Sequence, residues 1–158
     1  MTVTVRDNGA SKMLAELRAL GGKTVRVGIL DEAPKRESPG KGKKASRATL
    51  LEVAAVHEFG APAAGIPNRS FIRATVDLKA AEIQATRDKL AAQVAEGKIT
   101  AQVALERLGA FVQGLVQARI AEGIGPALKP ETVARKKSSK PLVDTGQLRS
   151  SVTWLVTG

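Results

Sequence analysis

The strongest pattern in the sequence is a run of helical periodicity from residue 70 to residue 122. Apolar residues recur every three or four positions on both sides of Gly97, which interrupts the run. Thr100 stands where a hydroxyl can cap the second half, and Gly123 where a glycine can end it. Two such helices joined by a short turn pack most simply as an antiparallel hairpin. The apolar positions are Ile72, Val76, Ile83, Leu90, Val94, Val103, Leu108, Phe111, Val112, Leu115 and Ile120.

Shorter helices are expected ahead of this hairpin. Residues 10–20 have helical spacing and end at a pair of glycines. The pattern Thr49-x-x-Glu52 is typical of a capping box, in which each end residue satisfies a backbone amide of the other. It predicts a second short helix that runs to about Phe59.

Two segments alternate in polarity, as half-buried strands do. They are residues 23–30 and residues 151–157, and the second makes Trp154 a core residue. The fold class that follows is α+β, with a small sheet, expected to be antiparallel, packed on the two long helices. The inward-facing strand residues are Val25, Val27, Ile29, Val152, Trp154 and Val156.

Two long basic loops separate these elements, at residues 31–46 and 123–144. The first is rich in Pro, Gly and Lys and has almost no apolar residues, so we expect it to be mobile in the free subunit. The chain carries a formal charge of +10, which points to an anionic partner, although basic loops can also serve solubility alone. The expected contacts with that partner are Lys35, Arg36, Lys41, Lys43, Lys44, Arg135, Lys136 and Lys137.

Composition bounds what such a chain can do. Its 158 residues fit one domain, and 3% aromatic residues predict a thin core to which partner subunits can add burial. Cysteine is absent, which excludes disulfides and thiolate metal sites. The first ten residues are polar and no apolar run is long enough to cross a bilayer. We therefore expect a protein made in the cytoplasm that has no membrane partner.

No arrangement of residues points to catalysis. His57-Glu58 could begin a helical zinc-protease motif, but Ala61 stands where the second histidine would fall. His57 is the only histidine, so a catalytic triad would need the same residue, and no Gly-x-Ser-x-Gly elbow is present. We expect no enzyme activity, no metal and no cofactor.

Binding of nucleic acid is a stronger alternative. The two basic loops could neutralise phosphates without regard to base sequence. Stacking on bases needs surface aromatics, and the chain has three Phe, one Trp and no Tyr. The alternative function is therefore a basic, DNA-associated protein without base specificity.

A motif precedes the long helices. It reads Val-His-Glu-Phe-Gly from residue 56 and continues as Ile-Pro-Asn-Arg-Ser-Phe-Ile-Arg from residue 66. Pro67 fixes an extended entry, and Arg69 or Arg73 is expected to reach a carboxylate. The residues of interest are His57, Glu58, Phe59, Gly60, Pro67, Arg69, Phe71 and Arg73.

A second motif follows the long helices. It reads Thr-Val-Ala-Arg-Lys from residue 132 and Lys-Pro-Leu-Val-Asp-Thr-Gly-Gln-Leu-Arg-Ser-Ser from residue 140. Asp144 is expected to cap a short helical turn, with Gln147 at the reciprocal position, and Gly146 to allow close packing. At least partial burial is expected for Leu142 and Leu148. The residues of interest are Pro141, Leu142, Asp144, Thr145, Gly146 and Leu148.

In this order, the two motifs resemble the neck, tail-completion and virion-morphogenesis proteins of tailed double-stranded DNA phages and Mu-like prophages. In those proteins a segment of the form His-Glu-Phe-Gly … Ile-Pro-x-Arg-x-Phe is followed, after a long helical region, by Pro-Leu-x-Asp-Thr-Gly-x-Leu-x-x-Ser. The resemblance covers roughly residues 23–157, and the helical middle is its least distinctive part.

The resemblance implies a structural virion protein that forms a ring at the head–tail junction or the top of the tail. Such a ring would be needed for tail completion or head–tail joining, six-fold by this resemblance, with twelve-fold the next choice nearer the portal. The implied partners are further copies of the chain, adjacent connector, tail-terminator or tail-tube proteins, and genomic DNA in the channel. The protein would reside in the virion, and in the host cytoplasm before assembly. The motifs do not separate neck, tail-terminator and minor tail components.

Overall fold

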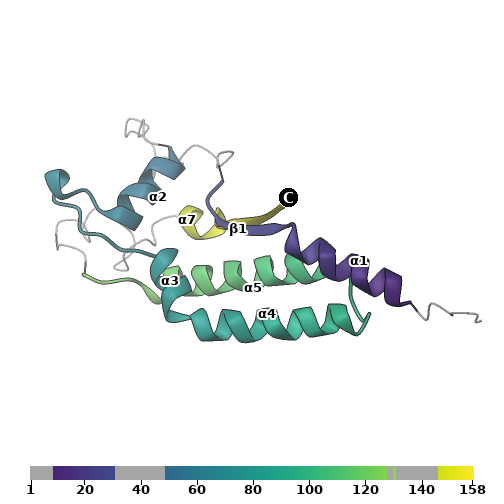
Figure 1. The fold of residues 1–158 in the computed structure, drawn as a ribbon. Coiled ribbons are helices and arrows are strands. Elements are labelled where there is room, and N and C mark those ends of the chain that lie inside the picture. Colours follow the sequence, from purple (N-terminus) through teal and green to yellow (C-terminus); the bar gives the residue numbers. More distant parts are fainter. Residues whose placement is uncertain (1–8, 31–48, 128–129, 131–145) are drawn as a thin grey trace, which may run out of the picture.

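The computed structural model describes residues 9–30, 49–127, 130 and 146–158. Its central element is α5 (Ala101–Glu122), which contacts both strands and most of the other helices (Figure 1). The remaining elements are α1 (Ala10–Gly21), β1 (Thr24–Gly28), α2 (Leu50–Phe59), a 3-10 turn η1 (Pro62–Ala64), α3 (Arg73–Leu78), α4 (Ala80–Ala95), α7 (Gln147–Ser150) and β2 (Thr153–Thr157).

The predicted helical hairpin is present and consists of α4 and α5 (Figure 1). Gly97 adopts a left-handed φ of 70° in the turn between them. The Thr100 side chain accepts a hydrogen bond from the backbone N–H of Val103 at 3.3 Å, and Gly123 ends α5 with a φ of 88°. The sequence predicted one continuous first helix, but it is divided at Lys79 into α3 and α4.

The sheet is antiparallel, as expected, and contains β1 and β2. Val25 pairs with Val156, and Val27 with Trp154, so the four residues predicted to face inward share one side of the ladder. On the opposite side, Arg26 lies beside Leu155. The α+β class is therefore confirmed, with the refinement that the sheet lies against α5 and that α4 packs on α5, α1 and α3.

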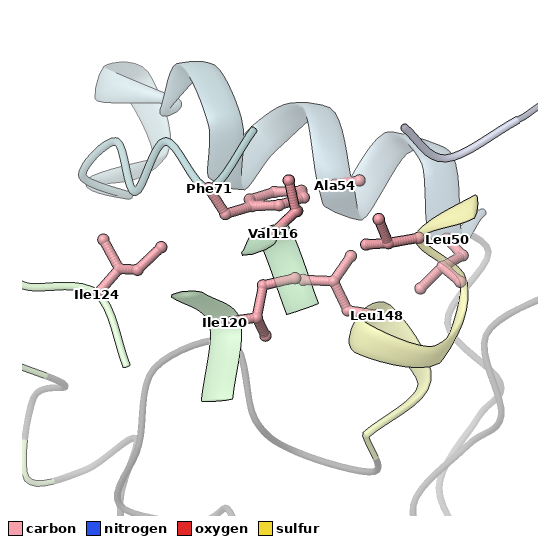
Figure 2. Packing of buried hydrophobic residues seen from close by; sticks show 8 residues of the cluster. Leu50, Ala54, Phe71, Val116, Ile120, Ile124 and Leu148 are labelled. Carbon is pink, nitrogen blue, oxygen red and sulfur yellow. The ribbon is translucent and has the colours of Figure 1, made fainter. Parts of the chain in front are cut away.

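Two groups of buried side chains lie along α5. The larger one, named the anchor cluster, is shown in close-up in Figure 2. The second one, named the far cluster, lies where α1 crosses the hairpin. The anchor cluster contains Leu50, Ala54, Phe71, Val116, Ile120, Ile124, Leu148 and Val152, and the far cluster contains Leu90, Val94 and Ala104 with Leu17, Leu20, Ile99 and Leu108 against them.

Local capping explains where several helices begin. The predicted capping box of α2 is present: Thr49 Oγ1 accepts from the N–H of Glu52 at 3.2 Å, and the Glu52 carboxylate accepts from the N–H of Thr49 at 2.6 Å. The carboxylate of Glu16 in α1 accepts from the N–H of Ala101 at 2.7 Å. This long-range contact fixes the start of α5 to α1.

The predicted mobile loop, residues 31–46, lies outside the described residues, and so does most of the second basic loop. Within the described ranges, no helix combines the length and the apolar character needed to cross a membrane.

Trp154 packs directly on the backbone of α5. A Cβ built on Gly109 would lie 2.7 Å from Cδ2 of the indole and 2.8 Å from Cγ, closer than such atoms approach one another. The indole therefore occupies the space that a side chain at position 109 would need. Gly114, one and a half turns further along the same helix, has no neighbour within 4 Å of its Cβ position.

This difference predicts opposite effects for two identical substitutions. Gly109→Ala should lower the free energy of unfolding by about 1–3 kcal/mol, because overpacking outweighs the gain in helix propensity. Gly114→Ala should raise it by up to about 1 kcal/mol, since only the propensity changes. Urea unfolding followed by circular dichroism measures both, and equal effects of the two variants would contradict the packing of Trp154 on Gly109.

Candidate functional site

The carboxylate of Glu58 lies at the centre of the first motif. Glu58 is only 7% exposed. Its side chain projects from the last turn of α2 toward the segment that opens α3. Each oxygen accepts two hydrogen bonds. Oε1 accepts from Ser70 Oγ at 2.6 Å and from the N–H of Arg73 at 3.1 Å, and Oε2 accepts from the N–H groups of Phe71 at 2.8 Å and Ile72 at 3.0 Å.

Two opposing effects set the protonation of Glu58. Burial raises its pKa, but the hydrogen bonds from Ile72, Ser70, Arg73 and Phe71 together lower the pKa below its ordinary value of 4.5. The net direction is downward because all four donors stabilise the charged form. Glu58 is thus an ionised acceptor for a turn of buried backbone.

Ser70 links the carboxylate of Glu58 to the first turn of α3. Its hydroxyl donates to Glu58 and accepts from the N–H of Ala74 at 3.0 Å. Thr75 then donates from Oγ1 to the carbonyl oxygen of Phe71 at 2.6 Å, and the ring of Phe71 is fully buried in the anchor cluster (Figure 2). The start of α3 is therefore capped by side chains, mainly from a different helix.

The chain between Glu58 and Ser70 folds back on itself. Gly60 has a φ of 79°, and a Cβ on it would lie 3.0 Å from the backbone nitrogen of Asn68. Ala61 and Ile66 form an isolated antiparallel bridge, and the N–H of Arg69 donates to the carbonyl oxygen of His57 at 2.6 Å. The return of the chain brings Ser70 back to the carboxylate that Glu58 presents.

The sequence predicted that Arg69 or Arg73 reaches a carboxylate, and for Arg69 the structure shows a different acceptor. Its guanidinium donates from Nε at 3.2 Å and from Nη2 at 2.9 Å to one acceptor, the carbonyl oxygen of Pro126. Burial lowers the pKa of Arg69 from its ordinary value, although an arginine stays protonated in proteins. The contact fixes the first motif to the chain just beyond α5.

Other residues of the first motif lie at the surface. Phe59 is 70% exposed, and Pro67 and Arg73 are exposed as well. His57 is half-buried in the last turn of α2. The motif therefore has an inner set of residues that build the fold and an outer set that the fold leaves accessible.

The second motif is described only from Gly146 onward, and Pro141, Leu142, Asp144 and Thr145 lie outside the described residues. Leu148 is buried in the anchor cluster, as predicted. The sequence predicted Asp144 as the cap of this turn. In the structure the N-cap residue of α7 is Gly146, which has no side chain that could cap the helix. Among the described residues no atom lies within 4 Å of the Cβ position of Gly146, so the expected close packing is not seen there; its left-handed φ of 78° is what favours glycine.

The ends of both basic segments converge on the anchor cluster. Ile29 precedes the segment 31–48 and Leu50 follows it, and both pack in this cluster. Ile124 precedes the segment 128–145 and Leu148 follows it, and both are buried in the same cluster. The eight basic residues predicted to contact an anionic partner all lie in these segments, outside the described residues.

No three His, Asp or Glu side chains gather as a potential metal site among the residues that the structure describes. Sequence reasoning recognised the first motif but missed its geometry. The available signal was Ser70, a good cap residue that stands just before the helical stretch.

Glu58→Gln should destabilise the protein by about 3 kcal/mol, because an amide replaces one acceptor oxygen and leaves buried N–H groups unsatisfied. The lowered pKa of Glu58 in the folded state means that its contribution is complete above pH 4.5 and is lost as the pH falls through the folded-state pKa.

Urea titrations between pH 3 and pH 7 test this claim. The variant should differ most from the natural protein at neutral pH and least in acid. Glu122→Gln, which changes a side chain that is 69% exposed, should shift the stability by less than about 0.5 kcal/mol at any pH. A similar small effect of Glu58→Gln would show that the four hydrogen bonds do not form.

Comparison of this chain with models of protein families, with curated proteins and with solved structures gave no match. The resemblance to phage neck and tail-completion proteins therefore rests on the residues of the two motifs, and a function drawn from it is a proposal.

Proposed function

We propose that the protein is a structural component of a tailed double-stranded DNA phage or prophage, which forms a ring at the head–tail junction or the top of the tail. The observation that carries the proposal is the convergence of both basic segments on one cluster of the fold. Residues 31–48 contain six Lys or Arg and three Asp or Glu, and residues 128–145 contain five and two. The two segments thus carry six of the ten net positive charges, and the described residues that flank each segment pack in the anchor cluster.

A ring places this region in the same position in every subunit. Repeated positive charge around a central axis suits either a DNA channel or the acidic surface of the next ring. The contacts of Glu58 and Arg69 in the first motif agree with a structural role. Both oxygens of Glu58 are occupied by backbone and hydroxyl donors, and the guanidinium of Arg69 by a carbonyl oxygen.

The alternative is a DNA-associated protein that needs no other virion component. Phosphate contact suits this alternative better than base recognition: Phe71 is buried, Trp154 packs on Gly109, and Phe59 is the one strongly exposed aromatic ring. Stacking along a strand needs several accessible rings, so base recognition is disfavoured. A measurement of DNA affinity at increasing salt concentration separates the two functions. A protein that binds DNA by itself should bind it without forming a ring, and its affinity should fall steeply as the salt concentration rises.

Phe59 is the second feature that supports an assembly role. Exposed aromatic rings are enriched at protein interfaces, and this one is 70% exposed in a chain with only three Phe. It projects from the same motif whose inner residues hold the fold. We assign it as a contact with a neighbouring virion protein.

Lys41, Lys43 and Lys44, replaced together by Gln, should impair particle completion and leave the fold intact, because the change removes three charges from one basic segment. The measurements are circular dichroism of the purified variant and infectious titre after complementation of a phage lacking the gene. A matched triple variant, Lys79, Lys89 and Lys98 to Gln, removes the same charge from exposed positions in and beside α4 and should support a normal titre. Normal titre from the first triple variant, or absence of the protein from purified virions, would overturn the proposal.

Phe59→Ser should reduce incorporation of the protein into particles several-fold and change its stability by less than about 0.5 kcal/mol, because an exposed ring contributes little to the fold. Leu78→Ser is the matched control, since Leu78 is 69% exposed but lies outside both motifs. Quantitative immunoblots of purified particles compare the two. Equal incorporation of both variants would remove Phe59 from the interface.

A further inference from the structure

The loop that follows α2 is exposed and wholly apolar. Residues 59–67 read Phe-Gly-Ala-Pro-Ala-Ala-Gly-Ile-Pro, nine positions without one polar side chain. Phe59 is 70% exposed, and residues 62–65 are exposed as well. Contiguous apolar surface of this kind marks a site of interaction on a soluble protein. We call residues 59–67 the apolar loop.

The apolar loop is held in one shape by its own backbone. The N–H of Ala61 donates to the carbonyl oxygen of Ile66 at 2.9 Å, and the N–H of Ile66 donates back at 3.1 Å. Inside this bridge the N–H of Ala64 donates to the carbonyl oxygen of Ala61 at 2.9 Å. The N–H of Gly65 donates to that of Pro62 at 2.9 Å. A loop that is ordered before it binds loses little conformational entropy in the complex, so this one presents a preformed apolar surface.

An apolar groove with a volume of about 620 Å³ lies among α1, β1, α4 and α5. Its lining includes five leucines, among them Leu17 and Leu108. The two charged residues that line it are Lys23 and Arg87, and both are basic. Arg87 lies 3.5 Å from Asp88, but both side chains are more than half exposed, so this pair neutralises little of the positive charge. An occupant that fits the groove is therefore apolar and carries no positive charge.

The apolar loop does not lie over the groove of its own subunit. The loop projects beyond α2 at one end of the molecule, and α1, whose C-terminal part lines the groove, lies toward the other end (Figure 1). Each subunit therefore carries one apolar loop and one groove at separate places, and no described residue of the same chain joins them.

We infer that the apolar loop of one copy of the chain inserts into the groove of the next copy. The side chain of Phe59 then lies between Lys23 and Arg87, where the face of an aromatic ring attracts a cation. The C-terminal end of α2, at the base of the loop, adds the partial negative charge of its carbonyl groups. A chain with a net charge of +10 repels its own copies, and this contact joins an uncharged surface to a basic one.

The apolar loop and the groove are different surfaces, so a contact between them is heterologous. Such a contact closes into a ring when the rotation between neighbours allows it. The inference rests on the proposed function and deepens it, because it names which neighbour Phe59 contacts and which surface of that neighbour receives it.

Photo-crosslinking from position 59 of the full-length protein tests the contact. The photoreactive analogue p-benzoylphenylalanine replaces Phe59, and isotope-labelled and unlabelled chains are mixed at rising concentration and irradiated. Adducts between labelled and unlabelled chains should form and should increase with concentration. Mass spectrometry of tryptic fragments should place them on residues 90–98 and 99–107, which contribute Ala91 and Leu105 to the groove.

Two pairs of variants test whether the groove is the acceptor. Ala91→Phe fills the groove and should lower the adduct yield about ten-fold, whereas Ala92→Phe, at an exposed position of α4 outside the groove, should leave the yield unchanged. Arg87→Glu places a carboxylate beside the ring and should lower the yield several-fold, whereas Lys89→Glu, also exposed and outside the groove, should not. Because Arg87 is exposed, its variant decides the matter if circular dichroism shows that Ala91→Phe does not fold.

Each other result overturns the inference. Adducts within one chain show that the loop contacts its own subunit, and adducts elsewhere on the next copy show a different contact. No adduct at any concentration, or equal yields from the Arg87 and Lys89 variants, shows that the groove does not receive the loop. These results leave the proposed place in the virion untouched, because particle composition and titre test that proposal, whereas the adducts are measured on the purified protein.

Discussion

α2 has one stripe of three buried residues, and the third of them is a carboxylate. Leu50, Ala54 and Glu58 are spaced one turn apart, and the two apolar members reach the anchor cluster. Glu58 extends the stripe by accepting four hydrogen bonds from the chain that opens α3. A buried charge is costly unless its partners are in place, so the position of α2 and the backbone path of residues 70–73 depend on each other.

Hydrogen bonds of Arg69 link α2 to the chain just beyond the end of α5. The N–H of Arg69 bonds to the last turn of α2, and its guanidinium bonds to Pro126. The first motif thereby joins the residues that follow the basic segment 31–48 to those that precede the segment 128–145. The side chains of Glu58 and Arg69 thus position residues that flank the basic segments, and neither side chain belongs to a basic segment itself.

What the sequence predicted correctly is local. The capping box at Thr49, the cap at Thr100 and the alternation of the two strands each involve residues within a few positions of one another, whose hydrogen-bonding needs can be read in order. The errors are non-local or conformational. Arg69 finds its acceptor 57 residues away, a separation at which no spacing rule operates. The break at Lys79 has no glycine or proline to signal it, and the role of Gly146 follows from its φ, which a sequence does not display.

The core contains few aromatic side chains, and the one tryptophan joins the sheet to α5. Gly109 lies on α5 between the residues of the far cluster and those of the anchor cluster, and the Trp154 indole rests on it. Four residues further, the amide of Gln113 donates to the carbonyl oxygen of Val152 at 2.7 Å. Gln117 donates to the same oxygen at 3.4 Å. β2 and the residue before it are therefore fixed to α5 by one ring and two hydrogen bonds, and β2 holds β1 through the ladder.

The two clusters of buried side chains lie toward different ends of α5. The anchor cluster, with the ends of both basic segments, lies toward one end of α5, and α1 begins toward the other (Figure 1). α5 is itself about 33 Å long. The residues that flank both basic segments and the contacts that α1 makes with the helical hairpin therefore lie in separate clusters of the core.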